Sequence, residues 1–362
     1  MQAPLFLHEP TSTPTPKDLR DEILKSPGFG SNFTDHMLVM EYSSDTGWQT
    51  GVIQKRQPFK IDPASGVLHT GQEIFEGMKA YRTEEGGAAI FRPKENARRF
   101  NMSANRMAMP EIPEDVFIAG IEEFVRIERN WIPEIGDGTL YLRPFMFASE
   151  AFIGVRPSKN YTFSIIASPV GGYFSNDANA LKLWICKEYS RAAPGGTGAA
   201  KCGGNYASSL VASAQAARKS CDQVLFLDAK ERRWIEELGG MNIFFVFDDG
   251  SIITPPLTGT ILPGITRDSI LKLADRMGRN VVETPYSLEQ LEADAQSGRL
   301  SEAFACGTAA VITSIGRLIG EEMDIVVGDG GAGAVASELR EILIGIQHGA
   351  RKDEYGWRHP VL

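Results

Sequence analysis

Apolar runs alternate with helical patterns along the second half of the chain, and this alternation restricts the possible folds strongly. Strands are predicted at 181–187, 223–228, 242–247, 302–306 and 311–315, because short apolar runs between turn residues are typical of buried strands. Helices are predicted at 206–220, 267–277, 287–296 and 336–347, and Ser287 with Gln290 has the pattern of a capping box. Such alternation indicates an α/β or α+β fold.

The first half mixes both kinds of element. Strands are predicted at 139–147 and 161–170, and Phe117, Ile121 and Phe124 recur at helical spacing within a helix near 114–130. Small, polar residues at 171–180 separate the two halves, and 362 residues are enough for two domains of about 150 residues or more. We therefore predict a loose N-terminal arm at 1–30, a smaller α/β domain at 31–170, an interdomain linker at 171–180 and a larger domain at 181–362.

Charge and cysteine content exclude several classes of protein. The net charge of −9 argues against a nucleic-acid partner and against an anionic membrane. No run approaches the roughly 18 apolar residues that a membrane helix needs, and the N-terminus lacks a signal pattern. The four cysteines form no CxxC pair and no His cluster accompanies them, which argues against a metal site. We expect a soluble, cytoplasmic protein without a metal.

Lys201 lies in the densest glycine cluster of the sequence, at 195–206. Glycines remove side chains, so a flat cofactor can lie against the backbone, and a lysine in such a pocket is desolvated. Desolvation lowers the pKa of an amine and makes it a nucleophile for a carbonyl group. A Walker A phosphate loop is the alternative, but it needs Gly before the lysine and Ser or Thr after it. Ala200 and Cys202 occupy those positions.

A second glycine motif, GxGxxG at 328–333, follows an apolar run and precedes a predicted helix, as a dinucleotide-binding fingerprint would. However, 29 residues follow it, without a clear second strand. Asp353 is at about the right distance for the acidic partner, but it lies in a charged tail. We interpret this motif as a glycine-rich turn.

Three further segments can bind an anion or hold a charge. The segment 262–266 leads into a helix, whose first N–H groups can bind a phosphate; the alternative is an ordinary helix start capped by Thr266. Glu236 and Glu237 precede two glycines and a strand, so they form either a plain turn or a carboxylate in a cleft, as partner for a cofactor ring nitrogen. The turn at 307–310 can hold an anion on its N–H groups or simply connect two strands.

Taken in order, these segments resemble the branched-chain aminotransferases, a family of the D-amino-acid-aminotransferase-like fold, which is fold type IV of the pyridoxal-phosphate enzymes. The resemblance runs from about Phe29 to the C-terminus. It rests on nine short segments in the same order: 33–37, 75–81, 91–93, 140–144, 169–174, 203–206, 239–242, 262–267 and 307–309. The resemblance implies a two-domain α/β (α+β) enzyme whose larger domain binds pyridoxal 5'-phosphate.

The resemblance also implies the roles of individual residues. Lys201 forms the Schiff base and then moves the proton between the substrate α-carbon and the cofactor. Glu237 pairs with the ring nitrogen, and Tyr206 hydrogen-bonds the 3' oxygen. The phosphate is held by Arg99, Ile265, Thr266 and Thr308. Arg191, Gly240, Met241, Asn242 and Gly264 complete the cofactor site. The residues implied to line the substrate pocket are Phe29, Thr70, Phe75, Tyr141, Arg143, Tyr173, Gly307, Thr308 and Ala309.

The implied reaction moves the amino group of leucine, isoleucine or valine to 2-oxoglutarate, and the implied assembly is a homodimer. Two departures from the family stand out. Thr70 replaces a tyrosine at the pocket rim, which predicts a wider pocket. Gly240 replaces a threonine of the animal members, and Ala310 and Thr313 replace their CxxC redox pair, so no redox switch is expected and the chain is closer to the bacterial members.

Two alternative functions remain at this stage. One keeps the fold and cofactor but changes the reaction to that of a D-amino-acid aminotransferase or an aminodeoxychorismate lyase; the chain length and the segment from Tyr141 to Arg143 argue against it. The other is a dehydrogenase that uses the turn at 328–333, or a binding protein without chemistry. Lys201, Glu237 and Arg99 together argue against lost chemistry.

Overall fold

A computed structural model describes residues 6–136, 138–171 and 180–362. The chain divides into two compact units. Unit 1 contains Met1–Tyr173, Ala200–Gly203 and Ile344–Leu362, and unit 2 contains Phe174–Ala199 and Gly204–Leu343. Neither unit is one continuous stretch of chain, because the short segment around Lys201 and the C-terminal segment belong to unit 1. Most of the predicted linker at 171–180 lies outside the described residues.

Unit 1 is built on a mainly antiparallel sheet in the order β1-β4-β2-β9-β8-β6-β7-β19, with β3 paired to β2 and β5 paired to β8. Its strands are β1 (Phe6–His8), β2 (His36–Ser43), β3 (Gly47–Trp48), β4 (Gly51–Lys55), β5 (Glu73–Phe75), β6 (Met78–Arg82), β7 (Ala88–Phe91), β8 (Thr139–Ala148), β9 (Asn160–Val170) and β19 (Arg358–Pro360). The predicted strands at 139–147 and 161–170 are confirmed as β8 and β9, which pair along their whole length.

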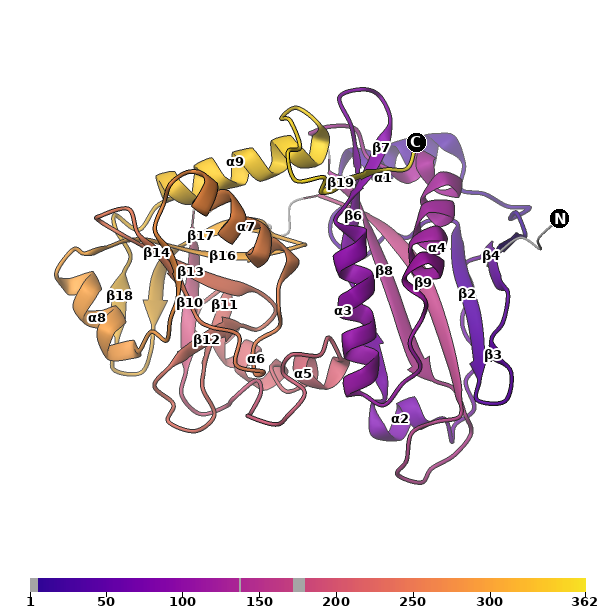
Figure 1. Cartoon of the computed structure of the whole chain (residues 1–362), viewed down its shortest axis with the longest axis horizontal. Helices are drawn as coiled ribbons and strands as arrows, with labels where there is room; N and C mark the ends of the chain where they lie inside the picture. Colours follow the sequence, from indigo (N-terminus) through magenta and orange to yellow (C-terminus); the bar gives the residue numbers. More distant parts are fainter. Residues whose placement is uncertain (1–5, 137, 172–179) are drawn as a thin grey trace. The chain divides into compact units, whose positions relative to one another are not determined.

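The helices of unit 1 are α1 (Lys17–Lys25), α2 (Gly66–Thr70), α3 (Pro93–Arg106), α4 (Glu114–Ile127) and the short 3-10 helix η1 (Arg129–Trp131). Helices α3 and α4 lie side by side along the sheet (Figure 1). Phe117, Ile121 and Phe124 face the core from α4, as their spacing predicts, and Phe100 joins them from α3.

Alternation along β8 gives the sheet of unit 1 two different faces. Leu140, Leu142 and Met146 lie in the core with the helices, so Tyr141 and Arg143 point to the opposite face. The N-terminal arm is more ordered than the sequence predicts, because it contains β1 and α1, and its apolar side chains Phe6 and Ile23 pack against the same core.

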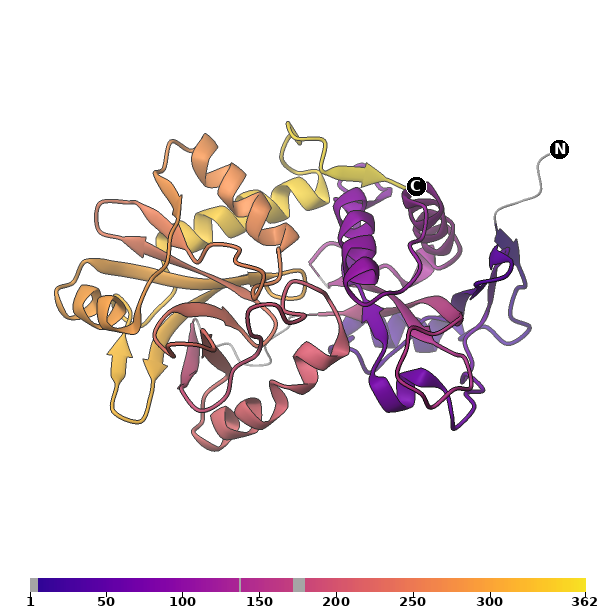
Figure 2. The same ribbon diagram turned by 60° about the horizontal axis from the view of Figure 1, so that its bottom comes forward.

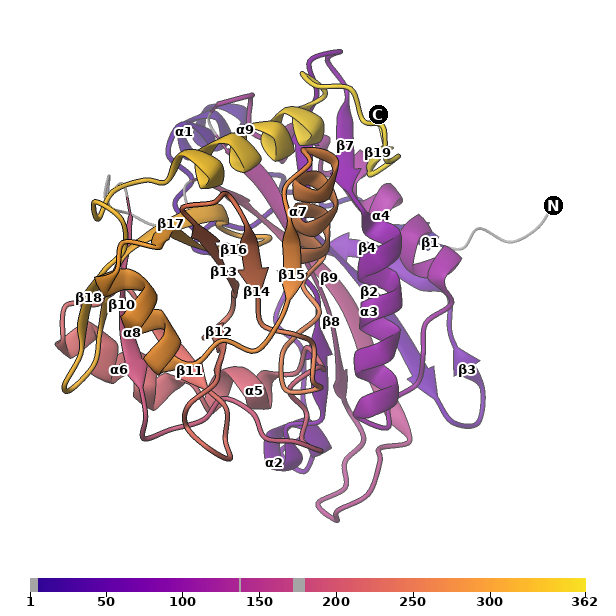
Figure 3. The same ribbon diagram turned by 60° about the vertical axis from the view of Figure 1, so that its left-hand side comes forward.

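Unit 2 is built on a mixed sheet in the order β12-β11-β10-β17-β16-β13-β14-β15, with β18 paired to β17. Its strands are β10 (Leu181–Cys186), β11 (Gln223–Leu227), β12 (Ile235–Leu238), β13 (Asn242–Phe247), β14 (Ile252–Thr254), β15 (Val281–Glu283), β16 (Leu300–Gly307), β17 (Val311–Ile319) and β18 (Asp324–Val326). Its strands curve strongly (Figure 3). Buried apolar side chains, Phe245 and Leu225 among them, form the core of this unit. The five strands predicted for this half are confirmed.

The helices of the second half are α5 (Gly203–Ala207), α6 (Leu210–Arg218), α7 (Ile265–Arg276), α8 (Leu288–Gln296) and α9 (Ala334–His348). Helix α6 packs on β10 and β11 through a small apolar cluster that includes Trp184, Ala212 and Phe226, and Figure 2 shows α5 and α6 following one another. The capping box of Ser287 and Gln290 is present at α8. No helix in the described part of the chain is long and apolar enough to cross a membrane.

The glycine motif at 328–333 forms a turn between β18 and α9, as interpreted from the sequence. Gly328 and Gly330 have positive φ angles of 56° and 83°, which side chains other than glycine adopt rarely. In unit 2 the backbone carbonyl of Ser301 also lies 2.4 Å from the position that a Cβ at Gly328 would occupy. These glycines are therefore explained by the backbone of the turn.

Candidate active site

Lys201 is held from both sides by unit 1. Its N–H donates to the hydroxyl of Ser103 on α3 at 2.9 Å, and its carbonyl accepts from the N–H of Phe75 at 3.0 Å. Ala200 and Cys202 are buried in the core of the same unit, and the N–H of Gly203 donates to the carboxylate of Glu73. The backbone at Lys201 is therefore fixed by the sheet and by α3.

The amine of Lys201 lies in a surrounding that favours its neutral form. Its Nζ is 4.8 Å from the centre of the Phe75 ring. Burial lowers the pKa of the amine from 10.5 to about 8, and the positive charge of Arg99 acts in the same direction. A neutral amine is the form that attacks a carbonyl carbon and that can accept a proton. This agrees with the reactive lysine predicted from the glycine cluster.

Glu76, which the sequence analysis did not single out, anchors Arg99. Glu76 is fully buried, and its carboxylate accepts from Nε of Arg99 at 2.7 Å and from Nη2 at 2.9 Å. Asn96 Nδ2 and the N–H of Gly77 donate to the same carboxylate at 2.8 and 3.0 Å. Burial alone would raise the pKa of Glu76, but the Arg99 guanidinium outweighs this effect and the pKa is lowered. The sequence offers one indication of this role, because Glu76 follows β5 directly, and a carboxylate that becomes buried at the end of a strand needs a cationic partner.

Three of the predicted substrate residues lie together with Phe75 on the face of the sheet opposite the helices. Arg143 Nη2 donates to the hydroxyl of Tyr141 at 3.2 Å, and its guanidinium lies 4.7 Å from the centre of the Phe75 ring. Phe29 meets the Tyr141 ring edge-on at 5.7 Å. Gly77 makes this arrangement possible, because a Cβ there would lie 1.9 Å from the Tyr141 hydroxyl. Arg143 can bind a carboxylate beside this aromatic wall.

Thr70 is not part of this group in the structure. Thr70 is exposed at the end of α2, and its hydroxyl donates to the carbonyl of Gly66 at 2.8 Å. Tyr173 lies outside the described residues.

Unit 2 holds the second group of predicted residues around Glu237. This side chain is 3% exposed. Its Oε1 accepts from Nη2 of Arg191 at 2.5 Å and from the N–H of Leu262 at 3.1 Å, and its Oε2 accepts from Nδ2 of Asn242 at 3.2 Å. Arg191 therefore contacts Glu237 directly and neutralises its charge. A buried carboxylate with a cationic partner is suited to hold a protonated ring nitrogen.

Helix α7 begins at Ile265, two residues before the predicted start, with Gly264 as its N-cap. The side chain of Thr266 makes no capping bond, so the ordinary cap considered for this residue is absent. Ile265 and Thr266 instead belong to the first turn of α7, and the positive end of a helix attracts a phosphate. Gly264 is required here, because a Cβ would lie 2.0 Å from Oδ1 of Asn242.

The remaining cofactor residues of unit 2 lie close to each other. Tyr206 is half-buried on α5, and a Cβ at Gly240 would meet its ring at 3.5 Å. A Cβ at Gly307 would lie 3.4 Å from Cγ of Met241. Thr308 and Ala309 lie in the hairpin between β16 and β17, next to β13. Apart from Thr70, the predicted residues that the structure describes thus fall into two groups, one in each unit.

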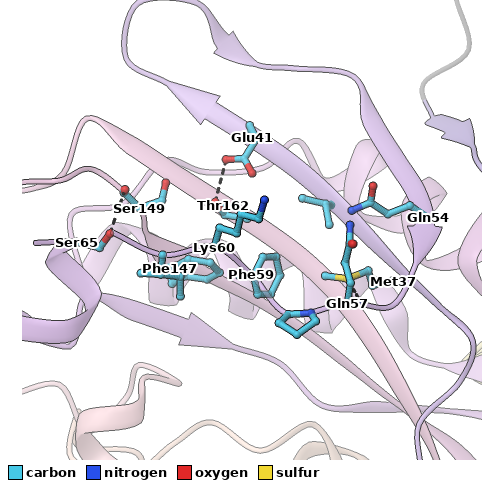
Figure 4. Close-up of a pocket in the computed structure, with 13 residues that line it drawn as sticks. Met37, Glu41, Gln54, Gln57, Phe59, Lys60, Ser65, Phe147, Ser149 and Thr162 are labelled. Carbon is cyan, nitrogen blue, oxygen red and sulfur yellow. Dashed lines mark hydrogen bonds between the residues drawn. The ribbon is translucent and has the colours of Figure 1, made fainter. Parts of the chain in front are cut away.

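The larger of two described cavities does not belong to either group. It has a volume of about 400 Å³ and lies between β2, β9 and the segment after β4. Lys60, Phe59 and Gln57 border it, and Glu41 accepts from the Thr162 hydroxyl at 2.8 Å (Figure 4). None of the predicted site residues lines this cavity.

The residues present fit pyridoxal phosphate. Unit 1 supplies the Lys201 amine with its lowered pKa and the Arg99 guanidinium, and unit 2 supplies the buried Glu237 carboxylate, the first turn of α7 and the Tyr206 phenol. Each of these groups matches one part of the cofactor: its aldehyde, its ring nitrogen, its phosphate and its 3' oxygen.

Comparisons with known proteins agree with this arrangement. The amino-transferase class IV family matches residues 73–318. The chain is similar to the branched-chain-amino-acid aminotransferase of Mycolicibacterium smegmatis, with 47% identity over 356 residues that cover 97% of each chain. It is also 46% identical to the probable branched-chain-amino-acid aminotransferase of Streptomyces coelicolor, over 362 residues and 100% of each chain.

Solved structures show the same fold. The branched-chain amino acid aminotransferase of Escherichia coli has a TM-score of 0.74 at 32% identity, covering 86% of this chain and 97% of that one. The enzyme of Thermobaculum terrenum in its PLP-form has a TM-score of 0.73 at 25% identity, covering 91% and 98%. The chain therefore belongs to the class IV aminotransferases, and within them to the branched-chain-amino-acid aminotransferases. The predicted fold type IV is confirmed.

Proposed function

We propose that the chain is a pyridoxal-phosphate-dependent branched-chain amino-acid aminotransferase that moves the amino group of leucine, isoleucine or valine to 2-oxoglutarate and yields glutamate. The observation that carries the proposal is Lys201, whose amine has a pKa of about 8 and whose backbone is fixed between Ser103 and Phe75. The relatives that share this chain's length carry the same activity in their names.

Each group of residues has a separate task in this proposal. Bound pyridoxal phosphate supplies a ring that accepts the electrons released when the substrate loses its α-proton. Lys201 holds the cofactor, and its Nζ accepts the α-proton and returns it. Glu237 keeps the ring nitrogen protonated, with Arg191 and Asn242 holding the carboxylate in place. Tyr206 binds the 3' oxygen.

Further residues bind the phosphate and orient the substrate. Arg99, positioned by Glu76, binds the phosphate together with the N–H groups of Ile265 and Thr266 and the hydroxyl of Thr308. Arg143 and Tyr141 orient the substrate carboxylate, and the rings of Phe29 and Phe75 contact its apolar side chain.

The test is a coupled assay of the purified protein with leucine and 2-oxoglutarate, together with absorption spectra before and after leucine is added. We expect glutamate to form and the visible absorption of the cofactor to change. Lys201→Ala should abolish turnover in a folded protein, and Glu237→Gln should reduce the turnover number more than Glu236→Gln does. Near wild-type turnover of Lys201→Ala would disprove the role of this lysine, and a larger loss in Glu236→Gln would reassign the ring partner.

We further propose that the protein is a homodimer in the cytoplasm. Two large apolar side chains on the loop between β8 and β9 support self-association, because Ile153 is 71% and Val155 is 94% exposed. Exposed apolar side chains that form one patch mark protein–protein interfaces.

A further inference from the structure

A second cavity lies within unit 2 and shares no lining residue with the candidate active site. Its volume is about 250 Å³, which is below the range of drug-sized ligand sites. Most of its wall is apolar. It is lined by Pro194, Asp228, Ala229, Lys230, Trp234, Ile235, Glu236, Pro255, Pro256, Thr258, Thr260, Ile261 and Pro285. We call it the Trp234 pocket.

Glu236 is a buried carboxylate in this wall. It is 7% exposed, and its Oε1 accepts from the Thr260 hydroxyl at 2.5 Å. Its Oε2 is buried and has no hydrogen-bond donor among the described residues. A buried carboxylate oxygen without a donor is costly, so a ligand donor that meets Oε2 when the carboxylate rotates toward the pocket would be bound with a gain in free energy. Burial raises the pKa of Glu236, in agreement with an incompletely satisfied carboxyl group.

The walls of the pocket are formed before any ligand binds. The turn between β11 and β12 is fixed by Asp228, whose carboxylate accepts from the N–H groups of Lys230, Glu231, Arg233 and Trp234 at 2.7–3.0 Å. Four of the lining residues are prolines, whose φ angles are fixed by their rings. A rigid wall reduces the entropy that a ligand must overcome on binding.

We propose that the Trp234 pocket binds a small alkylammonium compound, whose N–H donates to Oε2 of Glu236 and whose aliphatic groups pack against Trp234 and the prolines. An ammonium is favoured over a neutral donor because hydrogen bonds between charged groups are the stronger kind. Asp228 and Glu236 outnumber Lys230 at the pocket, which disfavours an anion. The volume restricts the ligand to about the size of an amino-acid side chain with its amine.

The experiment is calorimetric titration of the holoenzyme with N,N-dimethylisobutylamine. This tertiary amine is protonated at neutral pH, has one N–H to donate and cannot form an imine with a carbonyl cofactor. The matched probe is N,N,N-trimethylisobutylammonium, which has the same charge but no N–H. We expect saturable binding of the first compound at one site per chain, and binding of the second that is weaker by about ten- to a hundred-fold. Equal affinities, or no saturable binding of the first, would overturn the proposal.

Variants locate the bound amine. Glu236→Gln should lower the affinity for the tertiary amine by a similar factor. Glu322→Gln removes the same charge at an exposed position elsewhere in unit 2 and should leave the affinity for the tertiary amine unchanged. If Glu236→Gln does not fold, Trp234→Ala provides a second test, because Trp234 is only half-buried and its loss removes one wall. Wild-type affinity in a folded Glu236→Gln or Trp234→Ala protein would show that the amine binds elsewhere, and would overturn the proposal.

Discussion

Lys201 illustrates how the surroundings of one residue determine its chemistry. An isolated lysine is protonated at neutral pH, whereas this amine is desolvated beside Phe75 and close to the charge of Arg99. Both effects disfavour the ammonium form. The same surroundings hold its backbone through Ser103 and Phe75, so a nucleophile with a lowered pKa is also a nucleophile in a fixed place.

This pKa predicts the pH dependence of cofactor binding. Because the pKa of Lys201 is lowered to about 8, its neutral form predominates above that pH. The rate at which cofactor-free protein combines with pyridoxal phosphate should rise with pH and level off above about 8. Stopped-flow absorbance measures this rate, and Nα-acetyl-lysine amide with free pyridoxal phosphate is the control. A rise that continues to the ordinary lysine value of 10.5 would contradict the desolvated amine.

A prediction about substrate preference concerns Thr70 and rests on the family resemblance, because the structure places this side chain exposed at the end of α2 and outside the group around Arg143. Replacement of Thr70 by tyrosine should narrow the range of substrate side chains that the enzyme accepts. Each methylene of space in an apolar pocket changes the discrimination between two substrates by roughly 1–3 kcal/mol. The measurement is the ratio of catalytic efficiencies for leucine and phenylalanine, which Thr70→Tyr should raise. Thr46→Tyr, at another exposed position of unit 1, should leave the ratio unchanged. An unchanged ratio in Thr70→Tyr would mean that residue 70 does not face the substrate.

The sequence alone is enough to predict the role of a residue where neighbouring residues in the chain determine that role. The glycines around Lys201 and the glycine before α7 are visible in the sequence. The partners Glu76 and Arg191 depend on which distant segments meet: Glu76 reaches Arg99 and Arg191 reaches Glu237 only through the folded sheets. Spacing along the chain does not contain that information, and the resemblance alone gave Arg191 a place near the site.

Elements show a similar division between local and distant causes. The sequence predicts one helix at 206–220, but the structure has α5 and α6. The hydroxyls of Ser208 and Ser209 bond the carbonyls of Asn205 and Tyr206 at 2.9 and 2.7 Å, and such bonds compete with the helical pattern. The apolar period continues across this interruption, which is why a periodic pattern does not reveal it. The strands of the second half, with their continuous apolar runs, were predicted within a few residues.

Helix α3 is fixed to the chain between β5 and β6 by the buried pair of Arg99 and Glu76, which gives a prediction about stability. Glu76→Gln leaves the guanidinium without its buried partner, so the free energy of unfolding should fall by about 3–5 kcal/mol. Urea unfolding at pH 7 measures this loss. Glu95→Gln on the same helix removes only two long pairs, with Arg92 at 3.7 Å and with Arg98 at 3.9 Å, in which the Glu95 carboxylate is 35% exposed, and should cost about 0–1 kcal/mol.

The same pair predicts a dependence on pH. The folded pKa of Glu76 lies below its ordinary value of 4.5, so its contribution is present above that pH and is lost as the pH falls through the folded pKa. The stability difference between wild type and Glu76→Gln should therefore shrink in acid. A difference that stays constant below pH 4.5 would show that the carboxylate charge is not the cause.

At the scale of the whole molecule, the proposed dimer makes a prediction about Val155. Val155→Asp, in the loop between β8 and β9, should shift the protein toward a monomer. It replaces an apolar side chain that is 94% exposed by a charged one, which is unfavourable in the core of an interface. Light scattering over a range of concentrations measures the mass. Val282→Asp, at a partly exposed position of β15 in unit 2, is the control. A dimer of unchanged affinity in Val155→Asp would exclude this loop from the interface.

Strand β19 links the fold to the order in which a ribosome makes it. It completes the first sheet by pairing with β7, Val361 enters the core of unit 1, and the Arg92 guanidinium lies 5.1 Å from the Trp357 ring. At roughly 5–20 residues per second, these residues follow β7 on the order of tens of seconds later, after the whole of unit 2. The hydrogen-bonding edge of β7 therefore has no strand beside it during synthesis. Unit 1, whose first strands are made early, is completed only when β19 has been made. A nascent chain of this protein has a long interval in which binding by a chaperone would protect that edge from pairing with another chain.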